Sequence, residues 1–234
     1  MRDIAFSRLL PIGPDDATVD LLVTIRPVSN DKDGTAGVLS TRFSSKSGTI
    51  TRMKEHISTI FSATNGAPTE TPLLPIEDAQ FSTNPADFSV TADRLYRELI
   101  PFGPGFQSLV GNVCLSPTHA FGTAGTPVSA HPTPSALGSP FPLDAAFHVA
   151  CAWGQRYFRT VVYPIAIRRR IIFKPTAFDE NYTTHVRPLE RDGDTLSFDI
   201  QIESLTGEIF ETIHKVDMRP IGGIPACPPD WIIA

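Results

Sequence analysis

The segment 140–158 (PFPLDAAFHVACAWGQRYF) constrains the fold of this chain more than any other. After Asp144 its residues are apolar on nearly every helical face, and a helix of that kind belongs inside a core. Asp144 stands where an N-cap or first-turn acid is favoured. The sequence therefore predicts a buried helix over about 143–158, around which the rest of the chain must pack.

The predicted helix carries an acid and a histidine one turn apart. Asp144 and His148 are spaced i, i+4, so their side chains share a face and can touch. A polar pair on a core helix costs free energy unless it is hydrogen-bonded or used. Two interpretations remain open: the residues form a catalytic pair, or Asp144 caps the helix and His148 is an ordinary hydrogen-bonded core histidine.

Composition narrows the class of protein. The 234 residues suffice for one large domain or two small fused ones, and 22 prolines favour strands and loops over a helical bundle. A net charge of −5 argues against a nucleic-acid partner, and no apolar run reaches the ~20 residues of a membrane span. The N-terminus lacks a signal-peptide core, and Cys114, Cys151 and Cys227 form no metal pattern. We expect a cytoplasmic protein without a metal ion.

Short strands are predicted on both sides of the helix from β-branched enrichment, alternation and turn residues. Before the helix, strands are expected at 4–12, 20–28, 37–43, 49–61 and 107–115, with a polar turn at 30–34. After it, they are expected at 161–167, 170–173, 182–189, 196–202 and 208–218, with hairpin turns at Asp192-Gly193 and Thr206-Gly207. A short helix at 91–100 follows Thr91 as N-cap, and 101–106 and 116–139 are expected to be loops.

These elements predict an α+β fold with two antiparallel sheets, the second wrapped around the buried helix. That plan is the hot-dog fold, and two such halves make a double hot dog. We expect an incomplete first half at 1–65 (strands only), a linker at 66–87, and a second hot dog at 88–234.

Three segments carry a resemblance to a known family. They are LYRELIPFGPGF (95–106), PLDAAFH (142–148) and VVYPIAIRR (161–169), in that order. They resemble the short helix with its Y-G-P-x-F loop, the L-D-x-x-x-[QH] motif and the L-P-F-x-W strand of dehydratase domains from polyketide synthases and polyunsaturated fatty acid synthases. The resemblance covers residues 88–220 closely and 1–65 loosely.

The resemblance implies an activity in polyketide or fatty acid biosynthesis. Such domains eliminate water from a 3-hydroxyacyl thioester on the phosphopantetheine arm of an acyl carrier protein, so no further cofactor is expected. It implies Asp144 as general acid, His148 as its orienting partner, and a carrier protein and other megasynthase domains as partners. Backbone N–H groups near Gly103 would polarise the thioester carbonyl. The tunnel entrance would be lined by Phe102, Gly103, Pro104, Gly105 and Phe106.

Two departures from the family pattern matter. The tyrosine of Y-G-P-x-F is replaced by Phe102, which removes a hydroxyl. The motif H-x-x-x-G-x-x-x-x-P, which holds the family's catalytic base, is missing: His56, His119 and His131 lack the glycine four residues on. The chain is therefore expected to begin after the first-half helix, as a fragment, as a degenerate half, or with its base on another chain. Apolar surface left by a missing helix would favour a homodimer.

Three functions stay open. The first is a 3-hydroxyacyl-thioester dehydratase, favoured by the Asp144–His148 pair. The second is a non-catalytic dehydratase-like domain that binds acyl chains or scaffolds a megasynthase, favoured by the missing histidine motif. The third is a product-template-type cyclase, which also needs that histidine.

The remaining histidines and the basic run carry weaker expectations. His56 is expected to be structural, and His185 and His214 to lie at the surface. His119 and His131 fall in a Pro/Gly-rich loop within reach of a tunnel mouth, but a functional role is the disfavoured interpretation for both. The run 168–170 (RRR) is either a docking patch for an acidic carrier protein or a solvated strand end.

Overall fold

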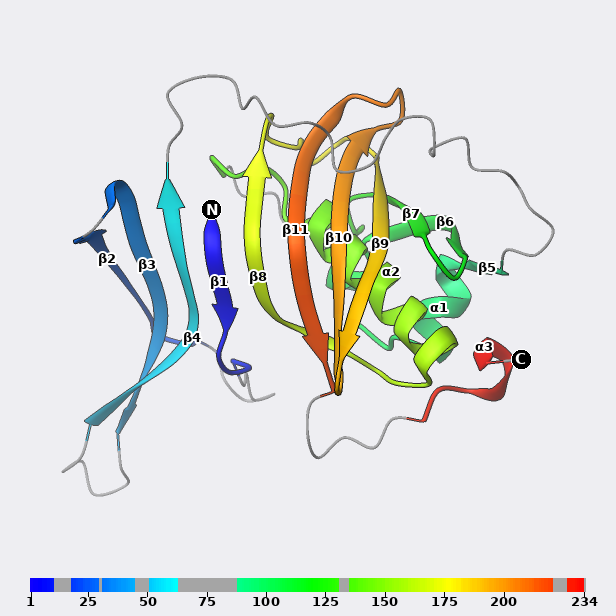
Figure 1. The fold of residues 1–234 in the computed structure, drawn as a ribbon, viewed down its shortest axis with the longest axis horizontal. Coiled ribbons are helices and arrows are strands. Elements are labelled where there is room, and N and C mark those ends of the chain that lie inside the picture. Colours follow the sequence, from blue (N-terminus) through cyan, green and yellow to red (C-terminus); the bar gives the residue numbers. More distant parts are fainter. Residues whose placement is uncertain are drawn as a thin grey trace.

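The computed structural model describes residues 1–10, 18–29, 31–44, 51–62, 88–130, 135–220 and 227–233, so the expected linker 66–87 lies outside the described residues. Figure 1 shows a long curved sheet with the helices gathered against the part built from the second half of the chain. The strands are β1 (Arg2–Phe6), β2 (Leu21–Val28), β3 (Asp31–Ser44), β4 (Thr51–Ser62), β5 (Phe88–Thr91), β6 (Leu109–Leu115), β7 (Ala120–Ala124), β8 (Tyr163–Ile172), β9 (Tyr182–Asp192), β10 (Thr195–Ser204) and β11 (Ile209–Arg219). The helices are α1 (Ala92–Glu98), α2 (Phe141–Phe158) and α3 (Asp230–Ile233), and a 3-10 turn spans Pro104–Phe106.

The described strands form one antiparallel sheet in the order β2-β3-β4-β1-β8-β11-β10-β9-β7-β6-β5. Its first part, β1 to β4, joins the second through β1, which pairs with β4 on one side and β8 on the other. The α+β double hot-dog expectation, with the second half wrapped around a buried helix, is confirmed (Figure 1). The two halves are joined edge to edge, so their strands make one continuous sheet.

The core lies between α2 and the strands that curve around it. The helix packs against β6, β7, β9 and β10, and its alanines and Val149 are fully buried. Close approach depends on Gly122 in β7, where an added Cβ would lie 2.9 Å from Leu109 Cδ2 and 3.2 Å from Val149 Cγ2. The predicted helix over 143–158 is therefore present, beginning two residues earlier.

Several predicted strand boundaries were wrong. The turn at 30–34 is mostly strand, because β3 begins at Asp31, and the two strands at 161–167 and 170–173 are the single strand β8. Strands β5 and β7 were not predicted, and β7 lies inside the expected loop 116–139. The alternation of apolar and polar residues in 197–204 predicts a strand with one exposed face, yet Asp199 and Gln201 on that face are buried, where they hydrogen-bond with Arg187 and Glu203.

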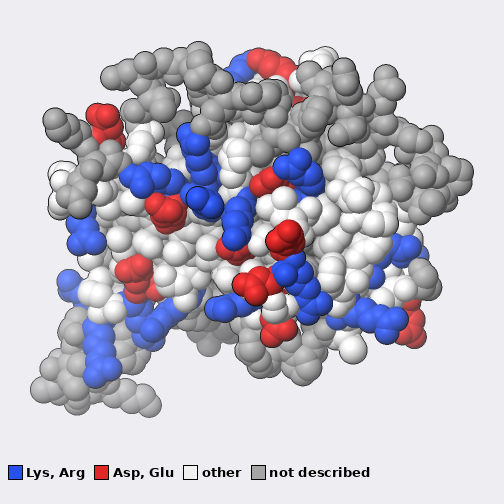
Figure 2. Space-filling view, viewed as in Figure 1, with Lys and Arg blue, Asp and Glu red and all other residues white. Residues whose placement is uncertain are grey.

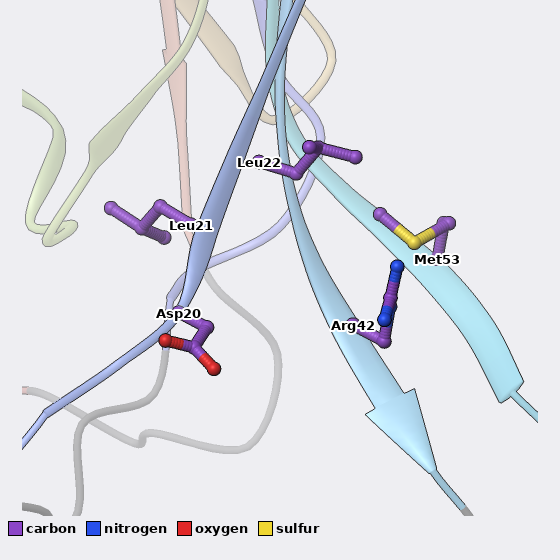
Figure 3. Close-up of a pocket in the computed structure, with 5 residues that line it drawn as sticks. All are labelled: Asp20, Leu21, Leu22, Arg42 and Met53. Carbon is purple, nitrogen blue, oxygen red and sulfur yellow. The ribbon is translucent and has the colours of Figure 1, made fainter.

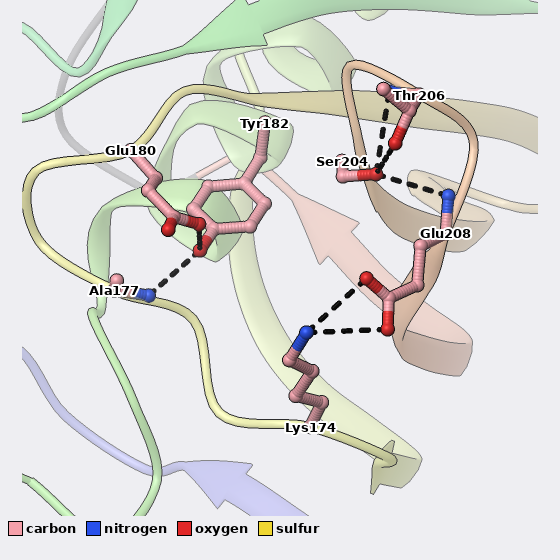
Figure 4. A network of polar contacts seen from close by, with 7 residues as sticks. All are labelled: Lys174, Ala177, Glu180, Tyr182, Ser204, Thr206 and Glu208. Atoms are coloured by element: carbon pink, nitrogen blue, oxygen red, sulfur yellow. Dashed lines mark hydrogen bonds and ion pairs between the residues drawn. The ribbon is translucent and has the colours of Figure 1, made fainter.

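The start of α2 is held by the loop between β8 and β9. Ser139 N–H donates to Thr176 O at 2.9 Å, and Thr176 Oγ1 donates to Ser139 O at 3.1 Å. Gly138 adopts a φ of +80°, and a Cβ there would meet Thr176 N at 2.5 Å. Figure 4 shows how this loop is tied down in turn: the Lys174 ammonium contacts Glu208 at 3.2 Å, and Tyr182 OH accepts the Ala177 N–H at 2.8 Å.

The opposite end of the sheet is apolar and open. Strand β2 is its terminal strand and exposes Leu21, Val23 and Ile25 by 49%, 61% and 70%. Figure 3 shows a shallow hollow there, in which Leu22 and Met53 lie beside the Arg42 side chain. None of the described helices is both long and apolar enough to cross a bilayer.

Candidate active site

Asp144 lies in the first turn of α2 and does not cap it. The N-cap residue is Pro140, which offers no side-chain cap, and the Phe141 N–H at the helix start donates to Ser139 Oγ at 3.5 Å. The Asp144 carboxylate instead accepts a hydrogen bond from Ser108 Oγ at 2.9 Å. The capping interpretation is therefore wrong, and the carboxyl is turned toward the segment that leads into β6.

The Asp144 carboxyl holds its proton more strongly than an ordinary aspartate. Burial raises its pKa from 3.8 to about 6, an effect that the Ser108 hydrogen bond partly offsets. The side chain still keeps 31% of its exposure. The Asp144 carboxyl is thus both reachable from solvent and partly protonated near neutral pH.

His148 is buried one turn further along the same face. Its Nε2 lies 3.6 Å from Asp144 Oδ2, a contact longer than a hydrogen bond. Its Nδ1 lies 3.0 Å from Tyr96 OH. Burial lowers the pKa of the imidazole to about 4, so His148 is neutral at physiological pH.

Tyr96 and Ser108 belong to the site and were missed in the sequence. The sequence pattern of 91–100 places Tyr96 on the apolar side of the helix with Leu95 and Leu99, yet its hydroxyl accepts the Leu109 N–H at 2.8 Å, and burial raises its pKa to about 12. Ser108 is fully buried. A buried tyrosine needs a partner for its hydroxyl, and that requirement was the available signal for Tyr96. Nothing in the sequence distinguished Ser108.

The loop at 102–106 lies over this pair. The Phe102 ring centroid is 4.9 Å from that of His148, and Phe102 and Phe106 remain 38% and 61% exposed. The Phe106 N–H donates to Gly103 O at 2.9 Å, so this amide is used within the loop. A Cβ on Gly103 would meet no atom within 4 Å. Of the predicted lining residues, the structure places Phe102 against the predicted histidine, and the roles of Gly103, Pro104, Gly105 and Phe106 stay predictions.

The other histidines lie elsewhere. His56 is buried and its Nε2 is 2.9 Å from Thr41 Oγ1, in keeping with a structural role. His185 was expected at the surface but is 2% exposed, with Nε2 2.7 Å from Glu203 Oε1. His119 stacks on His185 at 5.4 Å, on the sheet face turned away from α2. His131 lies outside the described residues, and His214 is half-buried.

The basic run 168–170 is not a uniform patch. Arg170 is buried and forms a bidentate ion pair with Glu211 at 2.7 and 2.9 Å, which leaves Arg168 and Arg169 exposed. On the face that Figure 2 shows, positive and negative side chains are interspersed. In the described ranges, no group of three or more His, Cys, Asp or Glu side chains is arranged to hold a metal ion.

An antiparallel sheet wrapped around a buried helix is the hot-dog architecture, and here the helix carries an acid and a histidine one turn apart. The sequence model described as the polyketide synthase dehydratase N-terminal domain matches residues 70–225. The chain therefore belongs to the polyketide synthase dehydratase family. A comparison with curated proteins finds no match.

Solved structures agree on the fold. The dehydratase domain from the CurJ module of curacin polyketide synthase has a TM-score of 0.72 and 18% identity, covering 93% of this chain and 73% of its own. The dehydratase domain of PpsC from Mycobacterium tuberculosis, solved with C12:1-CoA, has a TM-score of 0.63 and 18% identity, covering 94% and 74%. That of RzxB from Pseudomonas fluorescens has a TM-score of 0.60 and 11% identity, again covering 94% and 74%.

Proposed function

We propose that this chain catalyses dehydration of a 3-hydroxyacyl thioester held on the phosphopantetheine arm of an acyl carrier protein, with Asp144 as general acid. The observation that carries the proposal is the Asp144 carboxyl, which is reachable and has a pKa raised to about 6. A carboxyl with such a pKa holds a proton near neutral pH and can give it to a leaving group.

The reaction divides into two proton movements. A base takes the proton at C2 of the acyl chain, the electron pair forms the C2–C3 double bond, and the C3–O bond breaks. The Asp144 proton goes to the departing hydroxyl, which leaves as water. The exposed rings of Phe102 and Phe106 supply an apolar border that limits water near the reacting carbons.

The mechanism also requires a base that removes the proton at C2. Among the described residues the Asp144 carboxyl contacts Ser108 and His148, and no second histidine contacts it there. His148 is a poor base, because burial lowers its pKa to about 4. We assign the base to a group contributed from outside the described residues.

The lack of an identified base and the exposed apolar loop also favour a second, non-catalytic function. A dehydratase-like domain that binds acyl chains or braces a megasynthase needs the apolar loop and no base. Exposed Phe106 and Val128, at 61% and 105%, suit such a role. No observation specifically favours a cyclase.

Self-association is part of the proposal. The terminal strand β2 exposes Leu21, Val23 and Ile25, and an apolar edge strand favours pairing with another chain. Sedimentation of the chain across a range of concentrations tests this, with a strictly monomeric species as the contrary result.

The activity is tested by intact-mass measurement on a carrier protein loaded with a 3-hydroxyacyl group. We expect loss of one water with the wild type, and a rate at least about 100-fold lower with Asp144→Asn, because a general acid contributes that much. Asp93→Asn is the matched control, since it removes an 81% exposed carboxylate on α1. If the chain is instead a non-catalytic binding domain, the wild type binds the loaded carrier protein but removes no water from the 3-hydroxyacyl group.

A further inference from the structure

The hydroxyl of Tyr96 joins two parts of the site. Tyr96 is 6% exposed, and its oxygen accepts the Leu109 N–H at 2.8 Å. The same oxygen lies 3.0 Å from His148 Nδ1. Because the oxygen is already bonded to an N–H, the hydroxyl hydrogen is the group available for Nδ1.

The Ser108 hydroxyl is the other possible donor to His148 Nδ1, but its geometry favours donation to Asp144. Its Oγ lies 2.9 Å from Asp144 Oδ2 and 3.5 Å from His148 Nδ1. A serine hydroxyl has one hydrogen, and a carboxylate oxygen at the shorter distance accepts the stronger bond. Nδ1 therefore receives its hydrogen bond from Tyr96.

The tautomer of His148 follows from this hydrogen bond. A neutral imidazole carries one N–H, and the partner of one nitrogen determines where that hydrogen lies. With Nδ1 as acceptor, the hydrogen is on Nε2, the atom that faces Asp144 Oδ2 across 3.6 Å. The Phe102 ring lies 4.9 Å from the imidazole centroid, and the Tyr96 ring lies 5.6 Å from it and nearly perpendicular to it.

We propose that Tyr96 is a positioning residue that fixes His148 as the Nε2–H tautomer, so that the polar N–H of His148 faces the Asp144 carboxyl. The N–H then stabilises the carboxylate that remains after Asp144 has given up its proton, a consequence that rests on the proposed function. The assignment also prevents His148 Nε2 from accepting the proton at C2.

The tautomer is measured directly by NMR on the full chain with ¹⁵N-labelled histidine near neutral pH. Long-range ¹H–¹⁵N spectra distinguish protonated from unprotonated ring nitrogens, and the His148 signals are assigned by their loss in His148→Gln. We expect a protonated Nε2 and an unprotonated Nδ1 in the wild type. Tyr96→Phe is expected to give a mixture of tautomers, and kcat is expected to fall about tenfold with little change in KM.

The control is Tyr157→Phe, which removes a hydroxyl that donates to Leu115 O at 3.2 Å away from the pair. It is expected to leave the tautomer unchanged. A protonated Nδ1 in the wild type, or an unchanged tautomer in folded Tyr96→Phe, overturns the proposal.

Ser108→Ala keeps the test decisive where Tyr96→Phe does not fold. The Nε2–H tautomer persists in this variant if Tyr96 fixes it, whereas a mixture assigns that role to Ser108 and overturns the proposal. A wild type that loses no water from its substrate contradicts the proposed function alone, because the NMR spectrum reports the tautomer independently of turnover.

Discussion

Burial of the Asp144 carboxyl has opposite consequences for reactivity and for stability. A pKa raised from 3.8 to about 6 keeps a proton available for transfer, and it also means that the folded protein disfavours the ionised form. Between about pH 4 and pH 6 the folded state binds more protons at this group than the unfolded state does. The contribution of Asp144 to the unfolding free energy therefore falls as pH rises through that window.

Asp144→Asn is accordingly predicted to stabilise the protein at pH 7.5 while impairing the reaction. The gain should be about 1–2 kcal/mol, less than the ~3 kcal/mol of two pKa units, because the side chain retains solvent contact. Urea unfolding of wild type and variant at pH 7.5 and pH 4 measures it, and the difference should vanish at the lower pH. His148 and His119, whose lowered pKa values act in the opposite direction, are present in both proteins. Equal stabilities at pH 7.5 contradict a raised pKa.

At the scale of elements, the contact between α2 and β7 depends on Gly122. An added Cβ would lie 2.9 Å from Leu109 and 3.2 Å from Val149, both buried, so neither neighbour can move into solvent. We predict that Gly122→Ala lowers the unfolding free energy by about 1–3 kcal/mol. Gly103→Ala is the control, because it has a φ of −65° and open space at the Cβ position. Thermal melts of both variants decide the matter, and equal melting temperatures argue against tight packing at Gly122.

The same contact explains which elements could be predicted. Helix α2 was recognisable because it is buried on nearly all sides and has no charged residue between Asp144 and Arg156. Strand β7 was missed because its sequence, AFGTA, consists of small residues apart from Phe121, and only Thr123 is β-branched. The alanines and the glycine have low strand propensity, but they allow close packing against α2. A local sequence pattern does not reveal this, since α2 and β7 meet only in the folded chain.

The candidate site likewise contains residues that could be predicted from the sequence and residues that could not. Asp144 and His148 lie one turn apart on one helix, so their proximity followed from the helical period. Ser108 and Tyr96 are 36 and 52 residues away from the partners they contact. Their part in the site depends on how α1 and the segment before β6 pack against α2, which no local pattern encodes. The single exchange of tyrosine for Phe102 was visible in the sequence, but its position over His148 was not.

At the scale of the whole molecule, the short strand β1 connects the two halves of the sheet. Its Ile4 is 6% exposed and is opposite Ile167 of β8, while the Met1 amino group donates to Arg170 O at 2.8 Å. Strands β2, β3 and β4 have no helix packed against them in the described part of the chain. Their order therefore depends on attachment to the second half through β1.

Ile4→Pro tests this dependence, because proline cannot donate to the ladder and is confined to edge strands and bulges. We predict that amide hydrogen exchange accelerates throughout β3 and β4, while β9 and β10 keep their protection around α2. Ile4→Val, which costs about 1 kcal/mol, should leave both regions protected. Protection of β3 and β4 that survives Ile4→Pro shows that the first half holds its structure alone. Loss of protection across the entire sheet shows instead that the molecule unfolds as a single cooperative unit, with β1 as part of its core.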